Sequence, residues 1–147
     1  MKDISFSPLD SIIFLANRAG RLLANEVRRR ADMDSLGLQS QHMGILVDLW
    51  QQDGVRQQDL AVSTIKDKGT IARALDALER DNVLVRVPDP ADKRTNRIYL
   101  THKGKMLKEL LLPQAREVEA DVLAGLSEDD LQACKRVLVH IYRKLYQ

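Results

Sequence analysis

The chain has 147 residues, of which 44% are hydrophobic and 30% are charged, and its formal net charge is +2. This length and apolar content are typical of one globular unit and exclude disorder of the whole chain. No apolar run approaches the roughly 20 residues of a membrane span, and the N-terminus lacks a basic stretch followed by an apolar core, so we expect a cytoplasmic protein with no membrane partner.

The N-terminal third of the chain predicts two helices. Ser7, Pro8 and Asp10 are typical of a helix start, with a hydroxyl cap, a proline at the first position and a carboxylate at the third. Apolar residues then recur at helical spacing to about Arg30, and a break over residues 32–37 ends the helix. This helix would be roughly 35 Å long, which is long for so small a protein. The second helix is predicted over residues 40–51.

The middle of the chain predicts two short helices in succession. The first begins at about Gln57, and Asp67 or a near neighbour caps the second. The second helix ends at Asn82, because asparagine tolerates the left-handed conformation that follows a helix. We expect this helix to bury Ile71, Ala74, Leu75 and Leu78 and to expose Thr70, Arg73, Asp76, Ala77 and Arg80.

A β-hairpin is predicted after these two helices. Residues 83–87 alternate as in a strand, and residues 97–100 alternate in a returning strand. The turn between them contains Pro88, Asp89, Pro90 and Asp92. The predicted order is therefore helix, turn, helix and a hairpin with a long charged tip.

Two long helices are predicted after the hairpin. Thr101 caps a helix that runs to about Leu123, in which Pro113 should produce a kink, and Ser127 with Asp130 begins the last helix. Apolar residues of the last helix step by three and four, as in a helix packed lengthwise on another helix. With the first helix, these two are best interpreted as a dimerisation region that buries apolar stripes across a two-fold axis.

The positive charge is concentrated in the middle of the chain. Residues 66–105 contain ten Lys and Arg against six Asp and Glu, whereas residues 1–65 contain seven against eight and residues 106–147 contain six against seven. This asymmetry locates a candidate contact with a polyanion.

Five short motifs follow one another over residues 60–104: Leu60-Ala61, Asp67–Arg73, Leu78-Glu79, Pro88–Arg94 and Leu100–Gly104. This series resembles the winged helix-turn-helix of the MarR family of bacterial regulators. The resemblance implies a mainly helical single domain over residues 1–147. Residues 37–104 would form a winged helix-turn-helix with a small antiparallel β-hairpin wing, and residues 1–36 and 105–147 would form long dimerisation helices.

The resemblance also implies a function. It predicts a homodimer that binds double-stranded DNA at a pseudo-palindromic operator as a repressor or an activator, and that a small ligand or oxidation often releases. The second helix of the motif would enter the major groove, which is about 12 Å wide, with its N-terminal residues at the base edges. Candidate contacts of this recognition helix are Lys66, Lys68, Thr70 and Arg73.

The hairpin tip resembles the family's wing. Asp92 would hold Arg94 by a hydrogen-bonded ion pair and direct it into the narrow minor groove, where the potential is most negative. The alternative is an exposed turn salt bridge of little energetic weight. The candidate wing residues are Arg86, Asp92, Lys93, Arg94 and Arg97.

The resemblance suggests a ligand crevice between the dimerisation helices and the winged region. A small aromatic or anionic effector is expected there, because two arginines near the apolar stripe of the first helix could pair with an anion. The alternatives are solvated helix faces for the arginines and an ordinary helix-end position for His42. The candidate ligand-binding residues are Arg18, Arg21, His42, Met43 and Trp50, whereas His102 and His140 are expected at the surface.

Other classes of function have weaker support. A single cysteine excludes an intramolecular disulfide, and three scattered histidines do not form a zinc cluster, so we expect neither metal nor cofactor. Cys134 lies on an apolar seam, which favours a buried small hydrophobe over the alternative of an oxidation-sensing thiol. The chain lacks a Gly-x-Ser-x-Gly elbow and a phosphate-binding glycine loop, so we do not expect an enzyme. A winged-helix protein-interaction module would more often expose apolar residues where this chain has Arg73, Lys93 and Arg94.

Overall fold

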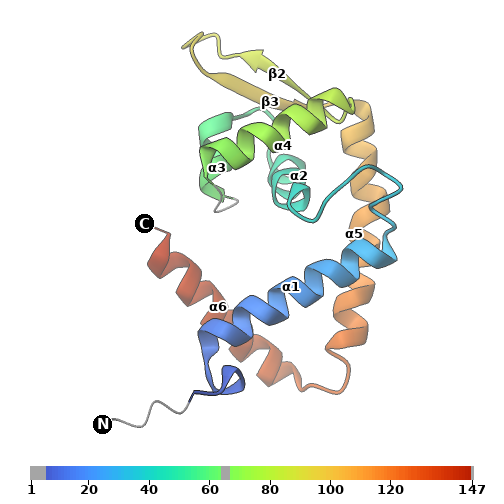
Figure 1. Ribbon diagram of the computed structural model, residues 1–147, viewed down its shortest axis with the longest axis vertical. Coiled ribbons are helices and arrows are strands. Elements are labelled where there is room, and N and C mark those ends of the chain that lie inside the picture. Colours follow the sequence, from blue (N-terminus) through green and yellow to red (C-terminus); the bar gives the residue numbers. More distant parts are fainter. Residues whose placement is uncertain (1–5, 64–66, 147) are drawn as a thin grey trace. The chain divides into compact units, whose positions relative to one another are not determined.

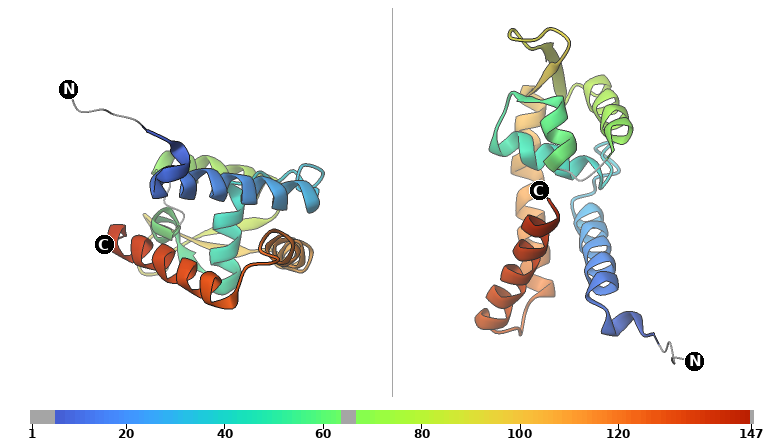
Figure 2. Two further views of the ribbon diagram at one scale, coloured as in Figure 1. Left: turned by 90° about the horizontal axis from the view of Figure 1, so that it is seen from below. Right: turned by 90° about the vertical axis from the view of Figure 1, so that its left-hand side faces the viewer.

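The computed structural model describes residues 6–63 and 67–146 and is shown in Figures 1 and 2. The chain divides into two compact units, Met1–Ala115 and Arg116–Gln147. The helices are the 3-10 turn η1 (Pro8–Asp10), α1 (Ile12–Arg30), α2 (His42–Gln51), α3 (Gln57–Ser63), α4 (Lys68–Arg80), α5 (His102–Val122) and α6 (Glu128–Leu145). The strands are β1 (Val55–Arg56), β2 (Leu84–Pro88) and β3 (Asn96–Leu100).

The predicted N-terminal helix is two elements rather than one. Ser7 does act as a cap, since the Leu9 N–H donates to its Oγ at 3.3 Å, but the helix that it starts is only the turn η1. Ser11 then adopts an extended conformation with its N–H on the Pro8 carbonyl, and α1 begins at Ile12. The predicted helix is interrupted because Ser11, with a φ of −111° and a ψ of 122°, leaves the helical conformation between the two elements.

The other predicted helix ends are confirmed by their hydrogen bonds. Asp67 accepts the Thr70 N–H at 2.7 Å, Thr101 Oγ1 accepts the Gly104 N–H at 3.1 Å, and Ser127 Oγ accepts the Asp130 N–H at 3.1 Å. Asn82 has a φ of 61°, the left-handed conformation expected after α4. Short polar side chains therefore set where these helices begin and end.

Among the described helices, none has the length and apolar character to cross a bilayer.

The hairpin is confirmed, and the sheet has a third strand that the sequence did not reveal. The strand order is β1-β3-β2, all antiparallel, and the hairpin of β2 and β3 projects beyond the helices of the first unit (Figures 1 and 2). Strand β1 has two residues, too few to show an alternation, and follows Gly54, whose φ of 75° turns the chain. In β2 the valines at 85 and 87 are exposed, whereas Leu84 is buried.

The core of the first unit lies beneath α4. Ile71, Leu75 and Leu78 of α4 are at most 2% exposed, and they belong to one cluster with residues of α2 and the sheet. The same cluster includes the buried residues Ile45, Leu46 and Leu49 of α2 and Leu84 and Ile98 of the sheet. The predicted inner face of α4 is therefore correct, and burying its large apolar side chains fixes the helix's rotation.

The structure explains why the last of the five motifs, Leu100–Gly104, ends in a glycine. Gly104 is buried at the start of α5, and its carbonyl accepts the Trp50 indole N–H at 2.9 Å. A Cβ at this position would overlap the carbonyl oxygen of Val83 and approach Leu100 Cδ2 to 2.9 Å. Only glycine allows the start of α5 to pack this closely on the backbone after α4.

We expect Gly104→Ala to lower the free energy of unfolding by about 2 kcal/mol, because the backbone around Val83 must shift. Gly20→Ala in α1 is the matched control, since a Cβ there meets nothing within 4 Å. It should raise the free energy of unfolding by up to about 1 kcal/mol. Urea unfolding at one protein concentration measures both, and equal effects of the two substitutions would contradict the packing assigned to Gly104.

Candidate nucleic-acid interface

A chain of polar contacts orders the N-terminus of α4. Asp67 accepts the Thr70 N–H at 2.7 Å and the Thr70 hydroxyl at 2.8 Å, and the Arg73 guanidinium donates to Thr70 Oγ1 at 3.3 Å. The backbone and hydroxyl hydrogen bonds from Thr70 lower the pKa of Asp67, which keeps the cap charged. Lys68 and Arg73 are exposed at this end of the helix. The structure therefore brings Lys68, Thr70 and Arg73 together, whereas Lys66 lies outside the described residues.

The wing tip presents one arginine to solvent. The Arg94 side chain is 90% exposed, and its Nε donates to Asp92 Oδ1 at 3.1 Å. The same carboxylate accepts the Arg94 backbone N–H at 3.1 Å, and these hydrogen bonds lower the pKa of Asp92. Asp92 thus restricts the orientation of Arg94 without covering it, as the predicted pairing requires. Lys93 is exposed beside it.

Arg86, a predicted wing residue, is held by two carboxylates of α4. Its guanidinium donates to Asp76 at 2.6 Å and to Glu79 at 2.9 Å, and its backbone N–H donates to Glu79 at 2.9 Å. These hydrogen bonds from Arg86 lower the pKa of Glu79. The DNA contact of Arg86 therefore stays a prediction, for a guanidinium that is already engaged within the protein. Arg86 lies on β2 and connects the wing to α4, because its guanidinium is paired with two carboxylates of α4.

Arg97 is likewise engaged within the protein. It donates to the Gly54 carbonyl at 2.9 Å and lies 3.4 Å from the carboxylate of Asp89. Asp89 is 1% exposed and also pairs with Arg56 at 2.9 Å. Sequence reasoning missed Asp89 and Arg56 as site residues, because the motif predicts only a turn at Asp89 and the two-residue strand that carries Arg56 has no pattern.

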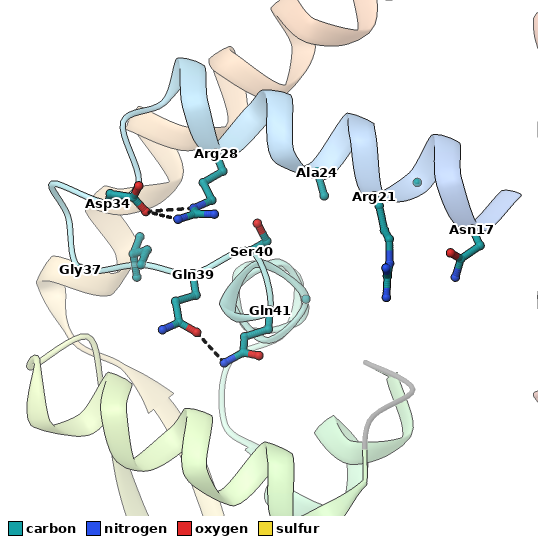
Figure 3. Close-up of a pocket in the computed structure, with 12 residues that line it drawn as sticks. Asn17, Arg21, Ala24, Arg28, Asp34, Gly37, Gln39, Ser40 and Gln41 are labelled. Carbon is teal, nitrogen blue, oxygen red and sulfur yellow. Dashed lines mark hydrogen bonds and ion pairs between the residues drawn. The ribbon is translucent and has the colours of Figure 1, made fainter. Parts of the chain in front are cut away.

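A cleft lies beside α1 in the first unit. This cleft has a volume of about 930 Å³, and Arg21 points into it (Figure 3). Arg28, on the same wall, is paired with Asp34 at 2.8 Å, whereas no partner for Arg21 is found among the described residues. The lining residues are Asn17, Gly20, Arg21, Ala24, Arg28, Asp34, Gly37, Leu38, Gln39, Ser40, Gln41 and Gly44.

Most of the predicted ligand residues lie outside this cleft. His42 is 3% exposed and its Nδ1 accepts the Gln39 N–H at 3.2 Å, and burial lowers its pKa. Met43 and Trp50 pack against the core, and the Trp50 indole N–H donates a hydrogen bond to the Gly104 carbonyl. Arg18 is exposed and does not line the cleft. Of the five predicted ligand residues, Arg21 alone lines this cleft, and the ligand-binding roles of all five stay predictions.

The cysteine and two of the histidines lie at the surface of the chain. Cys134 of α6 is exposed, whereas the sequence favoured a buried small hydrophobe on an apolar seam. His102 and His140 are exposed, as expected. No group of three metal-binding side chains occurs in the described part of the chain.

A short helix, a second helix with an exposed basic N-terminus and an adjacent β-hairpin define a winged helix-turn-helix. The family model of the MarR family matches residues 38–95. The crystal structure of the transcriptional regulator PA3341 is 31% identical, with a TM-score of 0.79, and the match covers 92% of this chain and 98% of that one. The chain belongs to the MarR family.

Two further comparisons agree with this assignment. YybA of Bacillus subtilis (strain 168), an HTH-type transcriptional regulator, is 28% identical over 99 residues, which are 67% of this chain and 65% of YybA. The chain thus matches slightly less than two thirds of that relative. A Listeria monocytogenes protein complexed with 26mer DNA has a TM-score of 0.84 at 20% identity, with 92% of this chain and 89% of that chain covered, and so shares the fold. The family consists of transcriptional regulators, which confirms the expectation that the chain is not an enzyme.

Proposed function

We propose that this MarR family regulator acts in the cytoplasm as a homodimeric repressor that binds a pseudo-palindromic operator. The observation that carries the proposal is that a side chain of α4 and a side chain of the wing line the same cleft. Lys68 of α4 and Arg94 of the wing line one cleft of about 270 Å³, together with amide side chains of α3 and the hairpin. Two cations from separate elements thus face the same space, which suits a sugar-phosphate backbone passing between two grooves.

The geometry suggests how DNA would be bound. The N-terminus of α4 carries Thr70 and Arg73 toward base edges in the major groove, where arginine recognises guanine bidentately. Arg94, held by Asp92, enters the adjacent minor groove. The Listeria monocytogenes protein of the same fold was crystallised with 26mer DNA, which supports this use of the fold.

Exposed apolar side chains support the homodimer. On α1, Ile13 is 78% exposed and Leu22 69%, and on α6, Leu138 is 49% exposed and Leu145 81%. Two helices with large exposed apolar residues are expected to be covered by another protein surface. A second copy places two recognition helices on one DNA face, about 34 Å apart, so the operator has two-fold symmetry. A dimer that covers both half-sites excludes other proteins from that DNA, which favours repression.

We expect Arg94→Ala to weaken binding to every duplex, because it removes a minor-groove cation. The slope of log K against log salt should become shallower by about one for each arginine removed from the DNA, thus by about two for a dimer. Fluorescence anisotropy over a salt series, with a duplex selected from the source genome, measures both quantities.

The matched control is Arg116→Ala, which removes an exposed arginine from α5, outside the winged region. Its affinity and salt slope should equal those of the wild type. If Arg94→Ala leaves the affinity unchanged at low and at high salt, the wing does not contact DNA. If the wild type retains no duplex at all, the chain instead uses its winged helix for another partner.

The cleft beside α1 supports a small anionic effector. Arg21 is a cation on its wall without a carboxylate partner among the described residues, and Asn17, Gln39 and Ser40 add polar groups around it. Binding of an anion there would act on α1 and on the segment that leads into α2, and so on the spacing of the two recognition helices in the dimer.

We expect benzoate, used as the probe, to lower the DNA affinity of the wild type about fivefold at saturation. Arg21→Gln should abolish this response, because it removes the unpaired cation of the cleft. Arg18→Gln, a neighbouring exposed arginine that does not line the cleft, is the control and should respond like the wild type. Anisotropy titrations measure the effect. An unresponsive wild type, or an equally abolished response in both variants, would contradict an anionic effector at Arg21.

A further inference from the structure

A buried carboxylate lies at the base of the wing. Asp89 is 1% exposed, and its Oδ2 accepts the Arg56 Nε–H at 2.9 Å and lies 3.4 Å from the Arg97 Nε. Its Oδ1 accepts the Ala91 N–H at 3.0 Å. Arg56 comes from β1, Arg97 from β3 and Ala91 from the wing loop, so one side chain connects three segments.

The sheet register explains why a carboxylate is needed there. Arg56 and Arg97 are direct partners across the β1–β3 ladder. Like charges directly opposite each other in antiparallel strands repel and destabilise the pairing. The Asp89 carboxylate lies beside both guanidinium groups and offsets their repulsion. The hydrogen bond from the Ala91 N–H and the charges of the two arginines lower the pKa of Asp89, which keeps it ionised.

The backbone of Asp89 also closes the wing loop. Its N–H donates to the Thr95 carbonyl at 2.9 Å, and its carbonyl accepts the Asp92 N–H at 3.2 Å. Asp92 in turn holds Arg94. The position of the wing arginine therefore depends on the residue that neutralises the pair of arginines below it.

We propose that Asp89 is a positioning residue for DNA recognition, which fixes the wing loop and Arg94 by drawing Arg56 and Arg97 onto one buried carboxylate. The proposal rests on the DNA-binding function proposed above. Without this charge, Arg56 and Arg97 repel each other, the base of the wing opens, and Arg94 no longer has the geometry that suits its groove.

Electrostatics alone and a positioning role make opposite predictions for the DNA affinity of Asp89→Asn. The substitution removes a negative charge from the most basic region of the chain, so electrostatics alone predicts tighter binding to any duplex. A positioning role predicts about tenfold weaker binding to the selected duplex, which is the usual scale for one impaired base pair in a site. It also predicts unchanged or tighter binding to a scrambled duplex of the same composition, so the specificity ratio falls.

The experiment compares four proteins by anisotropy on both duplexes, below the melting temperature of each. Asp89→Asn should reduce specificity, and Asp89→Asn with Arg56→Gln should recover most of it, because the double variant lacks the repulsion and has the wild-type net charge. Asp59→Asn is the control for charge, since Asp59 is exposed on α3 and its removal changes the net charge equally. It should retain the wild-type specificity ratio.

Each outcome decides between the alternatives. Equal or tighter binding of Asp89→Asn to the selected duplex, or no recovery in the double variant, would overturn the positioning role. If Asp89→Asn does not fold at the temperature of measurement, Asp89 stabilises the unit as a whole, and the proposal is also overturned. A wild type that binds neither duplex would instead contradict the DNA-binding function itself.

Discussion

The apolar stripe of α4 is the constraint on which the rest of the binding surface depends. Ile71, Leu75 and Leu78 are almost fully buried in the core of the first unit. Rotating α4 would bring these side chains into water at a cost of about 1.5–3 kcal/mol each. The outward position of Thr70 and Arg73 follows from this burial, since residues on the opposite face of the same helix have no other direction in which to point.

Carboxylates organise the arginines that surround this helix. Asp92 directs Arg94, the pair Asp76 and Glu79 holds Arg86, and Asp89 gathers two arginines at the base of the wing. The region of highest positive charge therefore contains acids that decide which cations remain available to a partner. Lys68, Arg73 and Arg94 remain exposed, whereas Arg86 and Arg97 connect the wing to its neighbours. The ion pairs of Arg86 thus connect β2 of the wing directly to α4.

Features set by neighbouring residues could be predicted from the sequence. The caps Asp67, Thr101 and Ser127 and the left-handed Asn82 were correct, because each depends on a few consecutive residues. The inner face of α4 was correct because its period is regular. Asp92 with Arg94 was correct as a pair because the two residues lie in one turn.

Features set by contacts between different elements could not be predicted. Strand β1 exists through its pairing with β3, far along the chain, and the role of Arg86 depends on carboxylates of α4. Trp50 was expected at a ligand, but its indole N–H donates to the carbonyl of Gly104, which lies 54 residues further along the chain. The pairing of Asp89 in the wing loop likewise depends on two arginines, Arg56 of β1 and Arg97 of β3. Side-chain chemistry indicates which contacts a residue can make, whereas the fold determines which contact it does make.

Recognition of DNA by two copies of α4 and its wing, acting as one symmetric unit, is the centre of the proposed function. Hydroxyl-radical footprinting of the wild-type protein on a duplex that it retains from the source genome tests this symmetry most directly. We expect two equal protected half-sites whose centres lie about 34 Å apart, each flanked by protection of a minor groove. A single protected half-site, or two sites without two-fold symmetry, would contradict it.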